Sequence, residues 1–120
     1  MEQLILHLFG DYILQNDKMA FEKKKKTTKG FWYCIWHCLL YTIPFLLITN
    51  YIGAFLIFLS HFLIDRYNII QYFIKIKNGT KNTNNFGYSE SVNKRLACVL
   101  FTLHDNIIHL IINYLIILHL

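Results

Sequence analysis

The sequence has 120 residues, of which 55% are apolar, 17% are aromatic and only 16% are charged. A soluble domain carries about 25% charged residues, and a domain this small leaves much of its surface exposed, so the composition excludes a small soluble fold. Three cysteines exclude a disulfide-stapled fold, and the net charge of +5 is placed between apolar segments, which indicates an integral membrane protein without a nucleic-acid partner.

Four apolar segments follow one another along the chain, at residues 3–20, 31–49, 51–73 and 96–120. Each has at least about 18 residues, which is enough for a helix to cross a hydrocarbon core of about 30 Å. Four isolated strands cannot close a membrane barrel, so helices are required. The sequence therefore predicts an all-α integral membrane protein, with residues 1–120 forming a single compact bundle of four transmembrane helices.

The basic residues predict how these helices cross the membrane. All of the 12 Lys and Arg residues except Arg66 lie in or beside two connections, residues 21–30 and 74–95. Four spans put both connections on one side, and the positive-inside rule makes that side cytoplasmic. We therefore expect a protein of the cytoplasmic membrane with both termini outside. Its partners would be membrane lipids, with anionic headgroups held at Lys23, Lys24, Lys25 and Lys26.

Three of the four segments carry a His and an Asp four residues apart, which places each pair on one face of a helix. These pairs are His7 and Asp11, His61 and Asp65, and Asp105 and His109. An ionised group at the bilayer centre costs about 2.5–3.5 kcal/mol, so such groups usually have a function. Imidazole nitrogens and carboxylate oxygens together predict a divalent metal site for one or two ions, zinc first, with manganese or iron as alternatives.

Further polar residues fall near the same depth in the predicted membrane. His37 adds a fourth imidazole, as a metal ligand or as a catalytic general base, and Arg66 is placed to stabilise developing negative charge. Four more side chains are expected to orient the ligands through hydrogen bonds: Gln15, Tyr41, Asn68 and Asn113.

The polar motifs resemble those of a known family. The run from His7 to Gln15, HLFGDYILQ, resembles the opening of a bacterial and phage membrane family, domain of unknown function 3307. His37 and the strings 61–65 and 105–109 follow in the order that family shows, so the resemblance covers nearly all of the chain. More distantly, the His and Asp pattern is similar to inner-membrane metal-dependent hydrolases of the damage-inducible type.

That distant similarity implies a divalent metal and hydrolysis of a lipid or of another ester or phosphoester. The leading hypothesis is therefore a membrane-embedded metal-dependent hydrolase. Two alternatives stay open at this point. The same groups could line a proton or ion conduit. They could also hold helices together in a small protein that binds a larger membrane partner or forms a homo-oligomer.

Overall fold

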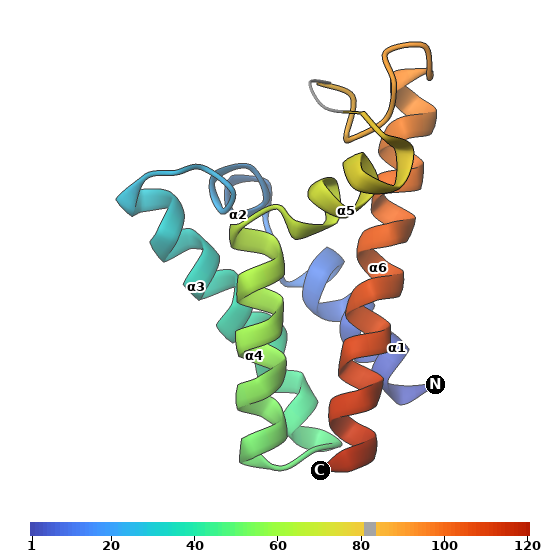
Figure 1. Ribbon diagram of the computed structural model, residues 1–120. Helices are drawn as coiled ribbons and strands as arrows, with labels where there is room; N and C mark the ends of the chain where they lie inside the picture. The colour runs from blue at the N-terminus through green and yellow to red at the C-terminus, as the bar shows by residue number, and fades with distance from the viewer. Residues whose placement is uncertain (81–83) are drawn as a thin grey trace. The chain divides into compact units, whose positions relative to one another are not determined.

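The computed structural model describes residues 1–80 and 84–120, and every regular element among them is a helix (Figure 1). This confirms the all-α prediction for the described part of the chain. Residues 81–83, part of the predicted basic connection, lie outside the described residues. The chain divides into two compact units: Met1–Tyr67 with His109–Leu120, and Asn68–Ile108.

The predicted first helix, residues 3–20, is divided into three pieces. They are α1 (Glu2–Leu8), the π-helix η1 (Phe9–Ile13) and α2 (Asp17–Glu22). The π-turn is closed by a hydrogen bond from the Leu14 amide to the Phe9 carbonyl, 3.0 Å long. The Asn16 side chain then accepts a hydrogen bond from the Met19 amide, which starts α2. The break falls at the polar residues 15–18, which interrupt the apolar segment.

The second and third helices begin at polar caps. α3 (Thr28–Thr42) starts where the Thr27 side chain accepts a hydrogen bond from the Gly30 amide, and α4 (Tyr51–Arg66) starts at Asn50 in the same way. α3 ends where Pro44 lacks the amide that an α-helix needs. The chain therefore continues as a short 3₁₀-helix, η2 (Ile43–Leu47), within the predicted segment 31–49.

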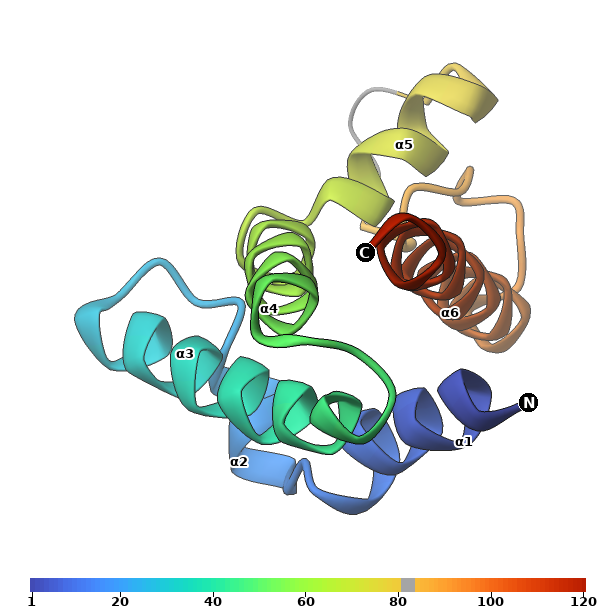
Figure 2. The same cartoon turned by 90° about the horizontal axis from the view of Figure 1, so that it is seen from below.

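In the first unit, α3 packs against α4 and α2 packs against α3, while η1 also contacts α3 (Figure 2). Gly10 of η1 makes this last contact possible, because a Cβ there would lie 2.6 Å from Cδ2 of Tyr41 and 3.2 Å from its Cα. Tyr41, Phe45 and Ile57 form the apolar core beside this contact. Close approach of η1 to α3 is what brings the first predicted His and Asp pair into the unit's interior.

The second unit contains α5 (Ile69–Asn78) and the first part of α6 (Lys94–His119). The predicted third segment, 51–73, is not one continuous helix. It is interrupted after α4 at Asn68, the N-cap of α5, whose φ of 52° is in the left-handed region. Ile70 and Ile74 of α5 are buried. The buried Asn85 amide donates to the carbonyls of Ser89 and Val92, which folds the connection back toward α6.

Among the described residues, two helical stretches are long and apolar enough to cross a membrane, Thr28–Leu47 and Lys94–His119. The successive helices α4 and α5 would make a third if they form one span. Large apolar side chains on these helices are exposed, for example Trp36 on α3 and Leu103 on α6, as expected for a surface that faces lipid. The four-span arrangement and the positions of the termini stay predictions.

Candidate metal centre

Three elements of the first unit bring four His and Asp side chains into its interior. Asp11 comes from η1, His37 from α3, and both His61 and Asp65 from α4. The side chains of these three helical segments meet because η1 and α4 both pack on α3. The exposed fractions of the side chains are 0% for His37, 1% for His61 and 4% for Asp65. Asp11 retains 12%, so the cluster is most open on its side.

Each carboxylate of this cluster approaches both of its imidazole rings. Asp11 Oδ1 lies 3.3 Å from His37 Nε2 and 3.4 Å from His61 Nε2. Asp65 Oδ2 lies 3.4 Å from His37 Nε2 and 3.5 Å from His61 Nε2. Ligand atoms about 2.0–2.1 Å from a tetrahedral zinc ion are about 3.3–3.4 Å from one another. The distances from Asp11 Oδ1 to the two imidazole nitrogens therefore match edges of such a site, and Asp65 approaches the same two imidazoles from a second ligand group.

The distance between the two imidazole nitrogens is shorter than the distances from carboxylate to imidazole. The Nε2 atoms of His37 and His61 are 2.9 Å apart, which fits either a hydrogen bond between the rings or two lone pairs that point at one cation. We refer to Asp11, His37, His61 and Asp65 as the metal cluster. Among the described residues, this cluster contains one group of ligand atoms close enough to share an ion, that of Asp11, His37 and His61, and it overlaps with a second group, that of His61, Asp65 and His109.

His109 approaches the other oxygen of Asp65. Its Nε2 lies 3.4 Å from Asp65 Oδ1, and its ring is 4.2 Å from that of His61, centroid to centroid. Asp65 thus faces the cluster with Oδ2 and His109 with Oδ1. This arrangement suits one ion held by the cluster with His109 fixing the carboxylate, or a second ion between Asp65 and His109.

Tyr41 packs directly against the cluster. Its ring stacks on the ring of His61 at 3.8 Å between centroids and an interplanar angle of 21°. Its hydroxyl lies 2.6 Å from His7 Nδ1 and accepts a hydrogen bond of 2.7 Å from Asn113 Nδ2. His7 Nδ1 is also 3.6 Å from Asp11 Oδ2. Tyr41 and Asn113 therefore lie where the sequence analysis expects residues that orient ligands, and His7 joins them.

Lys23 lies inside the cluster, which sequence reasoning missed. Its ammonium donates a hydrogen bond of 2.6 Å to Asp65 Oδ2 and lies 3.3 Å from His37 Nε2. Only 8% of the residue is exposed, so it is not free for lipid headgroups while this ion pair holds. Lys25 and Lys26 of the same run are exposed. The contact joins residues 42 positions apart, and no local spacing signals it.

The remaining predicted residues lie elsewhere. Arg66 donates hydrogen bonds to the backbone carbonyls of Lys23, Lys25 and Thr27, and so holds the connection between α2 and α3. Gln15 bonds to the carbonyl of Asp11 at 3.3 Å. Asp105 lies in the second unit, one turn before His109 on α6, and is outside the two ligand groups found among the described residues. The last predicted residue, Asn68, is the N-cap of α5 and has the left-handed backbone conformation.

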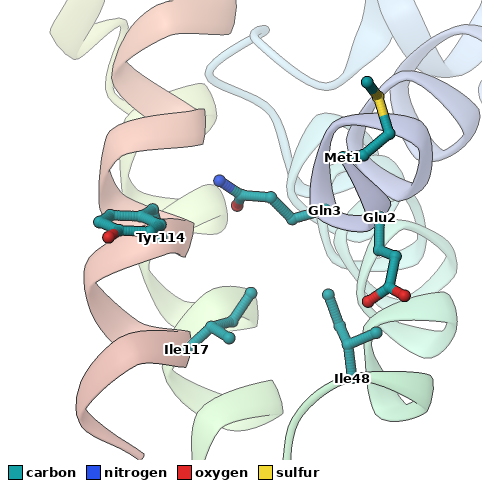
Figure 3. Close-up of a pocket in the computed structure, with 6 residues that line it drawn as sticks. All are labelled: Met1, Glu2, Gln3, Ile48, Tyr114 and Ile117. Atoms are coloured by element: carbon teal, nitrogen blue, oxygen red, sulfur yellow. The ribbon is translucent and has the colours of Figure 1, made fainter.

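A surface pocket of the first unit is lined by residues of α1, α6 and the end of η2: Met1, Glu2, Gln3, Ile48, Tyr114 and Ile117. Its volume is about 220 Å³. Figure 3 shows Gln3 extending from α1 toward Tyr114 of α6, with Glu2 on the same helix as Gln3. The Gln3 amide donates a hydrogen bond of 3.3 Å to the Leu110 carbonyl. None of the six residues that line the pocket belongs to the metal cluster, so the pocket and the buried polar centre are separate features.

Comparison with known proteins places the chain in a family. No curated protein and no solved structure matches it. A family described as a protein of unknown function (DUF3307) matches residues 1–120, the whole of the sequence. On that match, which covers every residue of the metal cluster, the chain belongs to the DUF3307 family.

Proposed function

We propose that the metal cluster binds a divalent ion and that the protein is a membrane-embedded, metal-dependent hydrolase of a lipid or of another ester or phosphoester. The observation that carries the proposal is two overlapping groups of buried donors, each with its ligand atoms within 4.8 Å of one another: Asp11 with His37 and His61, and His61 with Asp65 and His109. Two buried carboxylates need compensating positive charge, and a divalent ion supplies it at the point where the donors meet.

The donor set favours particular ions. Nitrogen and carboxylate oxygen without a thiolate suit zinc, manganese or iron. Cys34 and Cys38 are buried in α3 near His37, but neither belongs to the ligand groups among the described residues. Zinc is the first candidate because the distances from Asp11 Oδ1 to the Nε2 atoms of His37 and His61 match edges of a tetrahedral site.

The residues around the cluster suggest how hydrolysis would proceed. A bound divalent ion would supply a Lewis acid that polarises the scissile group and activates water at neutral pH. Asp11, the most exposed member of the cluster with 12% of its side chain accessible, lies on the side from which substrate and water would enter. His109 and Tyr41 would hold Asp65 and His61 in place, so that the ligands need no rearrangement when substrate arrives.

Metal content of the purified protein is the decisive test. We expect about one equivalent of zinc, manganese or iron per chain after purification in detergent without chelator. Asp65→Asn removes one charged donor while keeping the size of the side chain, and it should lower the metal content by tenfold or more, about the effect expected for losing a ligand. His119→Ala, at the exposed end of α6, is the matched control and should keep the wild-type content.

Hydrolysis is then measured on chromogenic phosphodiesters and carboxylic esters in detergent or vesicles. Activity should require the ion, disappear with chelator and return when the ion is restored. A wild-type protein that neither carries nor acquires zinc, manganese or iron would exclude the metal centre. A protein that binds the ion but cleaves neither class of ester would exclude the hydrolase while leaving the metal site intact.

A further inference from the structure

One lysine of the basic run differs from its neighbours. Residues 23–26 are all lysines, which is typical of a solvated topology signal. Lys23 instead directs its ammonium into the metal cluster, 2.6 Å from Asp65 Oδ2 and 3.3 Å from His37 Nε2. Lys25 pairs with Glu22 at the surface, and Lys26 is exposed. The buried position of Lys23 therefore calls for a role beyond topology.

The atoms that Lys23 contacts are atoms that would face a metal ion. His37 belongs to the ligand group with Asp11 and His61, and Asp65 to the group with His61 and His109, so the ammonium contacts one donor of each group. Two cations held at one shared donor would lie within about 4–5 Å of each other, where their repulsion inside a buried site is strong. If the Nε2 lone pair of His37 accepts a hydrogen bond from the ammonium, the same lone pair is not available to a metal ion. The ammonium and a divalent ion are therefore alternatives at this position.

The backbone around Lys23 allows such an exchange. Arg66 holds the carbonyls of Lys23, Lys25 and Thr27, so the connection stays attached to the end of α4. The lysine side chain is a flexible four-carbon stem that carries a strongly hydrated charge. It can leave the cluster by rotating about its own bonds while the connection keeps its course, and water and lipid headgroups would receive the ammonium outside.

We propose that Lys23 is a built-in competitor for the metal site. Its ammonium compensates Asp65 before an ion arrives, and it swings out of the cluster when the ion binds. The proposal rests on the metal site proposed above, and it concerns how that site is regulated. Its consequence is a weaker apparent affinity, because only the fraction of molecules with Lys23 displaced can bind the ion.

The size of this effect follows from the population. If the ammonium occupies the cluster in about 90% of the metal-free molecules, the apparent Kd is about tenfold higher than that of an unobstructed site. Removing the ammonium should recover this factor. Lys23→Met keeps an unbranched apolar side chain in the buried space and removes the charge.

The experiment titrates zinc, and separately manganese, into the metal-stripped protein in detergent against a competing chelator dye. Lys23→Met should lower the apparent Kd by about tenfold or more relative to wild type. Lys26→Met, which removes the same charge from an exposed position of the same run, controls for the general attraction of cations and should change the Kd by less than about twofold. Equal affinities for wild type and Lys23→Met would overturn the competition.

A second measurement uses the wild-type chain and does not depend on a variant folding. Acetylation of lysines, read by mass spectrometry, should leave Lys23 protected without metal and label it when zinc is bound. Lys26 should be labelled equally in both conditions. Continued protection of Lys23 in a protein that binds zinc would overturn the exchange while leaving the metal site in place. A protein that binds no metal in any form would instead refute the site itself.

Discussion

The hydroxyl of Tyr41 offers a direct test of how the polar centre is held together. Tyr41→Phe keeps the ring that stacks on His61 at 3.8 Å and removes only the hydroxyl. That hydroxyl contacts His7 Nδ1 at 2.6 Å and Asn113 Nδ2 at 2.7 Å. Tyr41 is fully buried, and Asn113 is 1% exposed, so water does not replace the lost oxygen without reorganising the unit.

The magnitude follows from these two contacts. A buried amide that loses its acceptor costs about 1–3 kcal/mol, and the second hydrogen bond contributes about 1 kcal/mol. We therefore expect Tyr41→Phe to lower the free energy of unfolding by about 2–4 kcal/mol. Tyr51→Phe removes a hydroxyl from a residue that is 85% exposed, and it should change the free energy by less than about 0.5 kcal/mol.

The assay is SDS titration of the protein in mixed micelles, followed by the helical circular dichroism signal. The free energy difference between wild type and Tyr41→Phe is compared with the difference for Tyr51→Phe. A loss below about 1 kcal/mol for Tyr41→Phe, the net value of a single ordinary hydrogen bond, would refute the view that this hydroxyl joins α1, α3 and α6.

Two further predictions concern packing and topology. Gly10→Ala places a Cβ 3.2 Å from the Tyr41 Cα and should destabilise the same SDS transition by about 1–3 kcal/mol through overpacking; an unchanged transition would contradict the close approach. In a Cys98→Ser background, where Cys34 and Cys38 are buried, cysteines introduced one at a time at Asn84 and Leu120 should react with membrane-impermeant reagents from opposite sides of the membrane. Reaction from one side would contradict the four-span topology.

The sequence predicted the helical class and the polar pattern because both depend on local spacing. His61 and Asp65, four residues apart, fall on one face of α4, and both are buried. The joining of Asp11, His37 and His61 depends on how η1 and α4 pack on α3. The sequence supplied no direct measure of that packing, although equal depth in the membrane pointed to it.

Other parts of the centre could not be predicted from local patterns. Lys23 contacts Asp65 although the two residues are 42 positions apart. Its place in a run of lysines instead predicts an exposed side chain at the membrane surface. The break after Ile13 did have a local signal, the four polar residues at 15–18 with Asn16 as the cap of α2, which the prediction of one continuous helix did not use. Arg66 was expected to act on substrate, yet a guanidinium at a helix end is equally suited to bind the free carbonyls of a nearby connection.

Because of the π-turn at Phe9–Ile13, the number of residues in the first segment determines which way its side chains face. A π-turn accommodates one more residue than an α-helical turn, and here it closes from Phe9 to Leu14. A single deletion within this turn would restore regular α-helical winding and rotate the residues beyond it by about 100°. Within the family, we therefore expect the number of residues between His7 and Asn16 to be constrained separately from their identities, with single deletions removing the inward-facing carboxylate even where Asp is retained.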